Sequence, residues 1–284
     1  SFRLSTCLNI PYAYKGINVQ WINLAKKVWF FFTNLKINIY IMENLNSIKF
    51  FLNKLFNPSD KIIIFDLGSR DCKESIEFSK LYNNSKIFAF EPNPVSYEKC
   101  IHNTKSYPNI EVFKYAVLDS IGNIKFFPID TKKTITTHTD GNPGASSLFE
   151  SSGKYPVEDY VQNEISVKGT RIDEFCKNNK IKTIDFVWMD LQGAELKALV
   201  GFGDYLDKVK IIHTEASNFE IYKNQPLFKE VKRYLNKNKF ILLSGNKNAE
   251  YFDNYIFVNY RYIHKYLRYF IAKYFYKIKK IIIS

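Results

Sequence analysis

Acidic side chains stand at the ends of several apolar stretches of this sequence. Asp66 closes the stretch KIIIFD, and Glu91 closes a second apolar run that begins at Lys86. Asp190 and Glu215 close the stretches IDFVWMD and VKIIHTE in the same way. Short apolar runs bounded by turn residues predict buried strands, and the carboxyl ends of parallel strands form the edge of a sheet at which ligands bind. The pattern therefore predicts a crevice ringed by carboxylates.

The turn after the first of these strands limits the chemical class of ligand that the crevice can bind. It reads GSRDCK, with Gly68 as its single glycine, whereas a pyrophosphate site needs several glycines and no acidic neighbour. Glu91, about 20 residues further on, stands where an acidic side chain can bind the hydroxyls of a ribose. A nucleoside with positive charge and no phosphate suits these carboxylates. S-adenosylmethionine, with its ammonium and sulfonium groups, is such a nucleoside, and we predict that the chain binds this methyl donor.

Methyl transfer from a sulfonium to a hydroxyl requires a group that removes the hydroxyl proton. Asp190, His213 and Glu215 are the candidates for this base. The two-residue alternation of a strand places His213 and Glu215 on one face, so that Glu215 could orient His213. Alternatively, Asp190 and Glu215 could hold a divalent cation that acidifies the hydroxyl, or His213 could be a packed strand residue. His138, in a polar segment, is a second candidate.

These residues need a framework of alternating strands and helices. Apolar periodicity predicts strands over residues 61–66, 86–91, 110–117, 124–127, 165–167, 184–190, 209–215, 239–244 and 255–260, and helices over residues 71–82, 95–106, 171–178, 193–200 and 226–237. The turn at 119–123 is expected to form a hairpin into strand 124–127, and the last two strands an antiparallel edge hairpin. The predicted fold class is α/β, a mostly parallel sheet with helices on both faces.

A polar segment, residues 131–153, interrupts this alternation. A loop of this length within a compact domain is uncommon unless it covers a ligand site. Its glycines and proline set turns just before an apolar anchor at Leu148, which argues against a disordered insertion. We expect the segment to cover the crevice and to present Ser146 and Ser147 toward it.

The charge and the cysteines of the chain narrow the range of partners. Of the net charge of +13, residues 1–60 carry +5 and residues 254–284 carry +7, which leaves +1 for residues 61–253. A nearly neutral core disfavours a nucleic-acid partner, because nucleic-acid enzymes carry positive charge around the cleft. The four cysteines form no CxxC pair, so neither a disulfide framework nor a zinc site is indicated. A reducing, cytoplasmic location follows as the expectation.

Three parts of the chain are expected: a helical N-terminal extension (1–57), a central domain (58–260) and a basic amphipathic C-terminal helix (261–284). Within the first part, residues 21–56 have helical spacing. The C-terminal helix could dock on the core, lie on an anionic membrane surface or meet a partner. No apolar run approaches the ~18 residues of a membrane span, so membrane contact would be peripheral. Because the chain starts at Ser1, we also expect it to be one domain of a longer protein.

Eight segments of the sequence, taken together and in this order, resemble the FkbM-type S-adenosylmethionine-dependent methyltransferases. They are IFDLGSRD, FAFEPNP, YAVLDSIGNIKFF, NPGASSLF, GTRIDEF, FVWMDLQGAELKAL, IIHTEAS and IYKNQPLF, within residues 61–260. The resemblance implies the class I methyltransferase (Rossmann-like) fold, a seven-stranded, mostly parallel sheet with an antiparallel last strand. It also implies O-methylation of hydroxyls on natural products and sugars.

The resemblance assigns roles to matching positions. Its first motif, which holds the methionine end of the donor, covers Asp66, Gly68 and Ser69, and its ribose-binding acid matches Glu91. The whole donor-binding set predicted in this way is Asp66, Gly68, Ser69, Arg70, Asp71, Glu91, Pro92, Ala116, Val117, Ser147, Asp190 and Gln192. The family has Asn and a second Gly where this sequence has Arg70 and Cys72. Cys72 is expected to crowd the turn, with Arg70 as a substitute ligand of the donor carboxylate.

The predicted function is an S-adenosylmethionine-dependent O-methyltransferase that acts on a hydroxyl of a sugar or glycan, within a larger glycan-synthesising protein. The alternatives are a lipid-linked or other small-molecule acceptor, methylation of RNA, and a binding module without activity on the same scaffold. The altered first motif favours the last of these. The retained Asp66, Glu91 and Asp190 argue against it.

Overall fold

The structure, a computed structural model, describes residues 45–262. Most of the predicted helix at 21–56 and nearly all of the predicted C-terminal helix at 261–284 lie outside these residues. No helix within residues 45–262 is long and apolar enough to cross a membrane.

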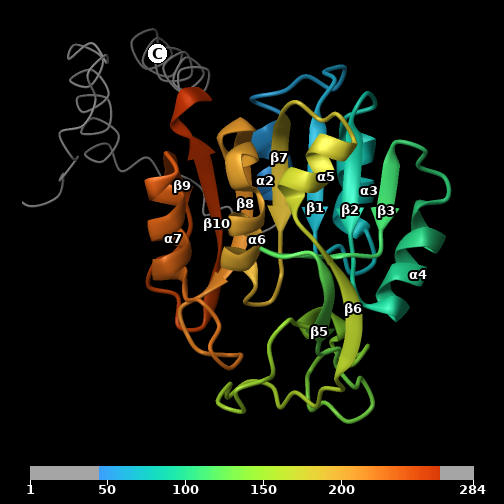
Figure 1. Cartoon of the computed structure of the whole chain (residues 1–284), viewed down its shortest axis with the longest axis vertical. Coiled ribbons are helices and arrows are strands. Elements are labelled where there is room, and N and C mark those ends of the chain that lie inside the picture. Colours follow the sequence, from blue (N-terminus) through green and yellow to red (C-terminus); the bar gives the residue numbers. More distant parts are fainter. Residues whose placement is uncertain (1–44, 263–284) are drawn as a thin grey trace, which may run out of the picture. The chain divides into compact units, whose positions relative to one another are not determined.

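A seven-stranded sheet forms the centre of the described part (Figure 1). Its strands are β1 Ile63–Leu67, β2 Lys86–Phe90, β3 Ile110–Phe113, β7 Ile184–Met189, β8 Val209–Ser217, β9 Phe240–Ser244 and β10 Phe252–Asn259. They follow the order β3-β2-β1-β7-β8-β10-β9. β10 is antiparallel to both of its neighbours, and the other neighbouring strands run parallel. The mostly parallel sheet and the antiparallel edge pair are thereby confirmed.

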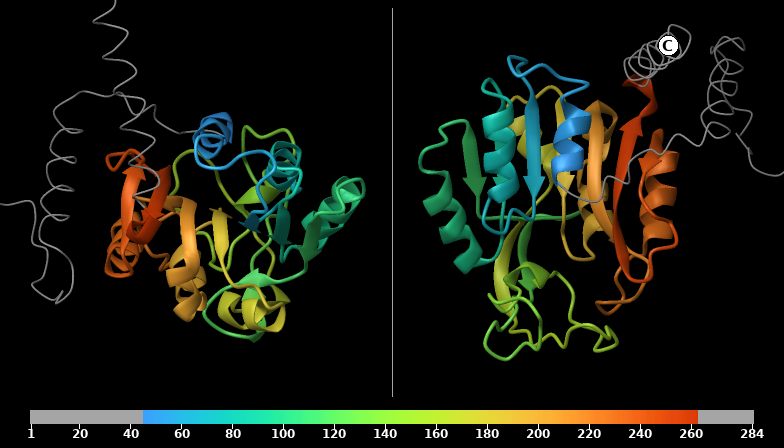
Figure 2. Two further views of the ribbon diagram at one scale, coloured as in Figure 1. Left: turned by 90° about the horizontal axis from the view of Figure 1, so that it is seen from above. Right: turned by 180° about the vertical axis from the view of Figure 1, so that it is seen from behind.

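Helices cover both faces of this sheet (Figure 2). Successive side chains of a strand point to opposite faces, so β1 places Phe65 in one core and Ile64 in the other. The core around Phe65 is closed by α5 Ile172–Asn178, α6 Glu195–Gly201 and α7 Phe228–Lys237. The core around Ile64 is closed by α2 Leu45–Leu52, α3 Lys73–Leu81 and α4 Pro94–Thr104. The helices predicted within residues 58–260 are therefore all present, with ends that differ by a few residues.

The described end of the predicted N-terminal extension belongs to the same core. Ile48, Leu52, Leu55 and Phe56 are buried in the cluster that contains Ile64 of β1. The expected boundary after residue 57 therefore does not separate two cores, because the apolar side chains before it pack directly on the sheet.

The turn between β2 and α4 shows how local sequence fixes a site residue. The side chain of Asn93 accepts a hydrogen bond from the Val95 amide at 3.1 Å, and Pro94 opens the helix. An N-cap followed by proline is a strong helix start, because the cap satisfies a free amide and proline has none to satisfy. Glu91 is consequently held at the end of β2, at the edge of the sheet.

A second, three-stranded sheet lies beside the carboxyl ends of the large one. It contains β4 Ala116–Val117, β5 Gly122–Phe126 and β6 Ile165–Thr170, in the order β4-β6-β5. The single strand predicted over 110–117 is therefore divided, since β3 and β4 pair in different sheets. The hairpin expected at 119–123 was also wrong, because β6 lies between β4 and β5 and pairs with both.

The segment between β5 and β6 folds over the carboxyl ends of the parallel strands (Figure 1). Isolated bridges join Phe127 to Ser147 and Ile135 to Asp159, and a short 3-10 helix spans Pro143–Ala145. The long polar segment is thus a folded element with paired backbone, as expected for a segment that covers a ligand site.

Candidate active site

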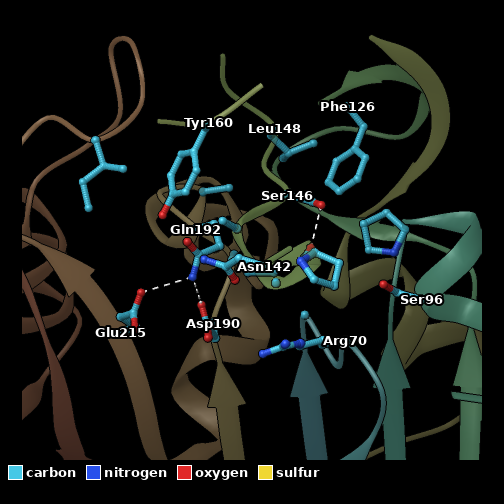
Figure 3. Close-up of a pocket in the computed structure, with 18 of the residues that line it drawn as sticks. Arg70, Ser96, Phe126, Asn142, Ser146, Leu148, Tyr160, Asp190, Gln192 and Glu215 are labelled. Carbon is cyan, nitrogen blue, oxygen red and sulfur yellow. Dashed lines mark hydrogen bonds between the residues drawn. The ribbon is translucent and has the colours of Figure 1, made fainter. Parts of the chain in front are cut away.

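A cavity of about 300 Å³ lies at the carboxyl ends of the parallel strands (Figure 3). Its walls come from the loops after β1, β2 and β7, from β4, and from the segment between β5 and β6. The predicted residues that line it are Gly68, Arg70, Glu91, Pro92, Ala116, Val117, His138, Ser146, Asp190, Gln192 and Glu215. The predicted residues that lie outside its lining are Asp66, Ser69, Asp71, Ser147 and His213.

Gly68 allows two loops of the site to meet. Its φ is +85°, and a Cβ built on it would lie 1.9 Å from the carbonyl oxygen of Asp190. Its amide donates to the carbonyl of Phe90 at 3.0 Å, which ties the turn after β1 to β2. Only glycine fits this close approach of backbone to backbone.

We expect Gly68→Ala to lower the free energy of unfolding by about 3 kcal/mol or more, because alanine would be strained at this φ and would also displace the Asp190 carbonyl. Gly153→Ala is the matched control, since Gly153 has φ +69° with open space around it. The free energy of unfolding of the control should fall only by the cost of an alanine in a left-handed conformation, about 1 kcal/mol. Urea denaturation measures both values, and equal losses would contradict the argument from close approach.

Arg70 and Cys72 both adopt left-handed backbone conformations, with φ of 51° and 60°. Such angles are uncommon for residues other than glycine and cost about 1–2 kcal/mol each, and strained residues of this kind gather at functional sites. The side chain of Cys72 is buried in the core around Ile64 and does not line the cavity. The turn directs the Arg70 amide at Glu91 Oε2, at 2.8 Å.

Glu91 is buried, and both of its oxygens are held by backbone amides. Oε2 accepts from Arg70 N and Oε1 from Asn93 N, each at 2.8 Å. Burial raises the pKa of Glu91 to about 8 in spite of these two bonds. The carboxyl is therefore fixed in position and retains lone pairs that can accept from a ligand.

The other acid of the first turn supports the turn from beneath. Asp66 is buried, and its Oδ2 accepts from the hydroxyl of Ser75 at 2.5 Å. Ser69 donates to the carbonyl oxygen of Asp66 at 3.0 Å, and Asp71 pairs with Lys73 at 2.9 Å. These residues, predicted as donor ligands, set the shape of the turn, while Gly68, Arg70 and Glu91 face the cavity.

Buried carboxyls make stability depend on pH. Burial raises the pKa of Asp66 to about 7, of Glu195 to about 7 and of Glu91 to about 8. Between the ordinary carboxyl pKa near 4 and these values, the native state binds more protons than the unfolded state, so the free energy of unfolding falls as pH rises. We expect a loss of at least about 2 kcal/mol from pH 5 to pH 8. Urea denaturation at constant ionic strength measures it, and a flat or rising profile would contradict the expectation.

At the other end of the cavity, Gln192 joins two acids. Its side-chain Nε2 donates to Asp190 Oδ1 at 2.7 Å and to Glu215 Oε1 at 3.2 Å (Figure 3). Burial raises the pKa of Asp190, and burial together with the charge of Asp190 raises that of Glu215 well above its usual range. The two carboxyls thus lie side by side with an amide between them.

Tyr222 and Ser147 hold Gln192 in place from behind. The Tyr222 hydroxyl lies 2.9 Å from Gln192 Oε1 and 2.8 Å from the carbonyl oxygen of Ala145. The hydroxyl of Ser147 donates to the Gln192 carbonyl at 2.7 Å. Gln192 itself has φ 50°, a strained backbone conformation. Its neighbours therefore hold both its backbone and its side-chain amide in position. Tyr222 is a site residue that sequence reasoning missed, although it lies in the quoted segment IYKNQPLF.

His213 does not reach the cavity. It is buried, its ring stacks on Trp188 of β7 at 3.9 Å between centroids, and its ring nitrogens have no hydrogen-bond partner among residues 45–262. Burial lowers its pKa to about 3, so the imidazole is neutral. The pairing of His213 with Glu215 as base and orienter is therefore not the arrangement that the structure presents.

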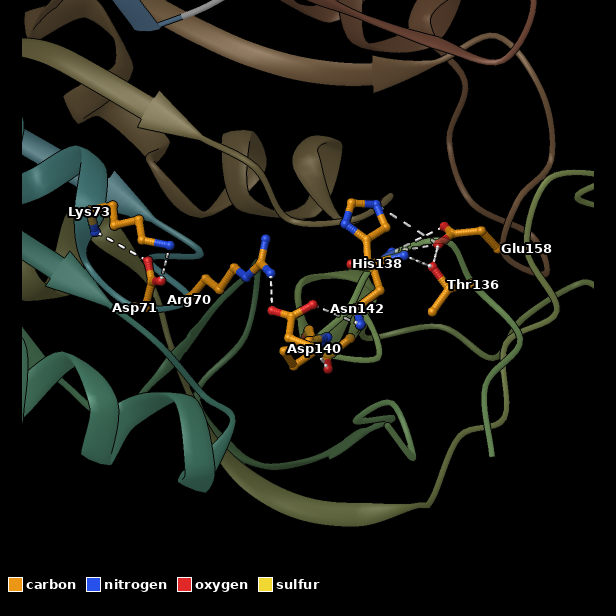
Figure 4. Close-up of polar contacts among 10 residues, drawn as sticks. Arg70, Asp71, Lys73, Thr136, His138, Asp140, Asn142 and Glu158 are labelled. Carbon is orange, nitrogen blue, oxygen red and sulfur yellow. Dashed lines mark hydrogen bonds and ion pairs between the residues drawn. The ribbon is translucent and has the colours of Figure 1, made fainter. Parts of the chain in front are cut away.

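The covering segment is tied together by a polar network (Figure 4). Glu158, whose side chain is 7% exposed, accepts from Thr136, from Tyr160 at 2.6 Å and from Asn142 at 3.0 Å. His138 lies 4.0 Å from the same carboxylate. These residues carried no motif in the sequence, and only the fold gathers them.

Arg70 connects this network to the sheet. Its guanidinium forms an ion pair with Asp140 at 2.5 Å, in the segment over the cavity (Figure 4). A Cβ on Gly144 would lie 3.3 Å from the Arg70 side chain, so the segment also packs on the arginine stem. The turn after β1 and the covering segment therefore meet at Arg70.

The strand order and the antiparallel β10 define the class I methyltransferase fold. Comparison with known families extends this result. The sequence profile of the methyltransferase FkbM domain matches residues 68–242, and the chain belongs to this family.

Two curated proteins and a solved structure illustrate the likeness. The chain is 30% identical over 169 residues to the 2-O-methyltransferase NoeI of Sinorhizobium fredii, covering 57% of this chain and 66% of that protein. It is 23% identical over 154 residues to the hexuronic acid methyltransferase AglP of Haloferax volcanii, covering 54% and 55%. A SAM-dependent methyltransferase from Aquifex aeolicus aligns over 83% of this chain and 97% of its own, with a TM-score of 0.39 and 13% identity. The chain thus spans less than two thirds of either curated relative.

Proposed function

We propose that this chain is an S-adenosylmethionine-dependent O-methyltransferase that methylates a hydroxyl of a sugar or glycan. The observation that carries the proposal is one cavity, in a member of the FkbM family, with Glu91 at one end and the Asp190–Gln192–Glu215 group at the other. The names of NoeI and AglP, a 2-O-methyltransferase and a hexuronic acid methyltransferase, support a sugar as acceptor.

The residues present fit the methyl donor. Glu91 is fixed by two amides and can accept from the ribose hydroxyls, and the backbone of Gly68 lines the same cavity. The cavity lining also contains the apolar residues Ala116, Val117, Phe126 and Leu148, which suit contact with an adenine ring. At the other side, Arg70 can meet the donor carboxylate and Asp190 the ammonium. When bound, the donor supplies an electrophilic methyl on a sulfonium.

The chain's own part in the reaction is to place and deprotonate the acceptor. Glu215 and Asp190 can accept the hydroxyl hydrogen and take up its proton as the new carbon–oxygen bond forms and the sulfur–carbon bond breaks. A raised carboxyl pKa suits a base that works near neutral pH. We therefore assign the role of base to this pair and not to His213.

The alternative that Asp190 and Glu215 hold a divalent cation fits the side-chain atoms present at this position less well. In the observed orientation an amide nitrogen, which is no metal ligand, lies between the two carboxylates. Within residues 45–262, no group of three or more His, Cys, Asp or Glu side chains could hold a metal ion.

Two measurements test the proposal. Calorimetry with S-adenosylmethionine and S-adenosylhomocysteine should show binding of both. Incubation with labelled donor and a panel of methyl glycosides should then give a methylated product, identified by mass spectrometry. A wild-type chain that binds neither nucleoside, or binds the donor and methylates no glycoside or oligosaccharide, would refute the assignment.

Peripheral membrane contact through residues 261–284, a cytoplasmic location and a longer parent chain remain part of the proposal. They rest on the basic amphipathic pattern, the wide spacing of the cysteines along the sequence and the partial coverage of the relatives. Sedimentation with anionic vesicles, compared between the full chain and a chain that ends at residue 260, tests the first of them.

A further inference from the structure

The acceptor end of the cavity has an aromatic and apolar wall. Tyr155, Val157, Tyr160 and Phe252 line it, and Tyr160 lies directly above Gln192 (Figure 3). Val157 is 54% and Phe252 40% exposed. Tyr155 lines the same cavity as the proposed base Glu215, and burial raises the pKa of its phenol.

The rings of this wall are held rigidly. Tyr160 stacks on Tyr222 with centroids 6.0 Å apart and planes at 18°. Tyr155 lies 6.0 Å from Tyr160 and meets Tyr251 edge to face at 5.3 Å. Rings fixed in this way lose little entropy when a ligand packs on them, so they suit recognition of a flat or partly apolar group.

The ionisable groups of the cavity are mostly acidic. The carboxylates in its lining are those of Glu91, Glu158, Asp190 and Glu215, and its cationic or titratable nitrogen groups are Arg70 and His138. Arg70 is already paired with Asp140 and His138 lies beside Glu158. No lysine of residues 45–262 lines the cavity. An acceptor with its own carboxylate or phosphate would therefore face acidic groups, whose ionisation it would oppose, without a free cation to pair with.

From these observations we propose that the acceptor is an uncharged pyranoside that rests one face on Tyr155 and directs a hydroxyl at Glu215. A pyranose carries C–H groups on its face and hydroxyls around its rim, which complements an aromatic wall above a carboxyl–amide floor. Neutral hydroxyls can donate to Glu215 and Asp190 without electrostatic cost. This inference rests on the proposed function and specifies its substrate class, excluding uronic acids and sugar phosphates.

The test compares matched pairs that differ in one group: methyl glucopyranoside with methyl glucuronopyranoside, and methyl galactopyranoside with methyl galacturonopyranoside. Methyl transfer is measured with the full chain at saturating S-adenosylmethionine, and acceptor binding by saturation-transfer NMR with S-adenosylhomocysteine present. We expect the neutral member of at least one pair to be methylated with a kcat/KM at least about 100-fold above that of its uronide.

Variants of the wall supply the second arm. Tyr155→Ala should lower kcat/KM for the neutral sugar about tenfold, mainly through KM, while Tyr155→Trp should retain it. Tyr205→Ala, a half-buried tyrosine outside the cavity lining, is the control and should change neither value.

The outcomes separate this inference from the function on which it rests. Three results would overturn the proposal of an uncharged acceptor. The first is a preference for the uronides, and the second is that a chain that binds S-adenosylhomocysteine binds no member of either pair. The third is a kcat/KM of Tyr155→Ala equal to that of wild type. Failure of wild type to bind S-adenosylhomocysteine would instead overturn the proposed methyltransferase itself.

Discussion

Replacing Glu91 with alanine is expected to weaken binding of S-adenosylmethionine by about 100-fold or more, because two hydrogen bonds from ribose hydroxyls to a carboxylate are lost at a buried site. Glu91 is 5% exposed and is aimed at the cavity by the amides of Arg70 and Asn93. The positive charge of the donor should also lower the raised pKa of this carboxyl, so that binding releases protons at neutral pH. Calorimetry in buffers of different ionisation enthalpy measures both the affinity and the proton release.

The control for this experiment is Glu111→Ala, which removes an exposed glutamate of β3 that is paired with Lys86 of the neighbouring strand β2. Its affinity for the donor should match that of wild type. Because Glu91→Ala leaves two amides without acceptors, the thermal midpoints of all three proteins are compared, and binding is measured well below the lowest of them. A Glu91→Ala protein that remains folded and binds the donor as tightly as wild type would remove Glu91 from the donor site.

Glu215→Gln should lower kcat for methyl transfer by about 10² to 10⁴, the usual contribution of a general base, and leave donor affinity within a few-fold of wild type. The change keeps the size of the side chain and an oxygen that can accept from Gln192, so geometry should survive while the proton acceptor is lost. Since burial raises the pKa of Glu215, kcat of the wild type should rise with pH as this carboxyl ionises, above the usual pH range of a glutamate. That limb should be absent from the variant.

Glu164→Gln, at an exposed glutamate paired with Lys125, is the matched substitution without expected effect. Asp190→Asn tests the second acid of the pair. If Asp190→Asn removes the pH limb and Glu215→Gln does not, the base is Asp190. If both variants keep kcat and its pH dependence, neither carboxyl is the base and the acceptor site must be sought elsewhere. Measurements with and without EDTA complete the series, and we expect no difference between them.

The strand ends and their acids could be predicted from the sequence because the signal is local. A run such as KIIIFDLG encodes burial, the end of the strand and the turn within a few residues. Four of the predicted donor ligands nevertheless lie outside the cavity lining: Asp66, Ser69, Asp71 and Ser147. A sequence motif predicts that a turn is present at the site. It does not predict which side chains of the turn point into the cavity and which stabilise the turn itself.

His213 and Tyr222 are two residues whose roles depend on contacts between distant parts of the chain: such contacts keep His213 out of the site and bring Tyr222 into it. Strand alternation predicts His213 and Glu215 on one face, but residues two apart are about 6.6 Å apart along a strand, and only Glu215 of the two lines the cavity. Trp188, brought beside His213 by the pairing of β7 with β8, covers its ring. Tyr222 contacts Gln192 because the segment after β8 folds back beside the loop after β7, and no spacing in the sequence predicts that contact.

The sequence by itself determined the class of fold, the acids at the strand ends and the presence of a folded segment over them, because each depends on periodicity or on neighbours along the chain. The tertiary structure alone decided that β5 pairs with β6, that Gln192 lies between Asp190 and Glu215, and that an aromatic wall faces them. These features depend on which segments lie side by side, and that follows from the packing of the whole domain, in which many weak apolar contacts act together.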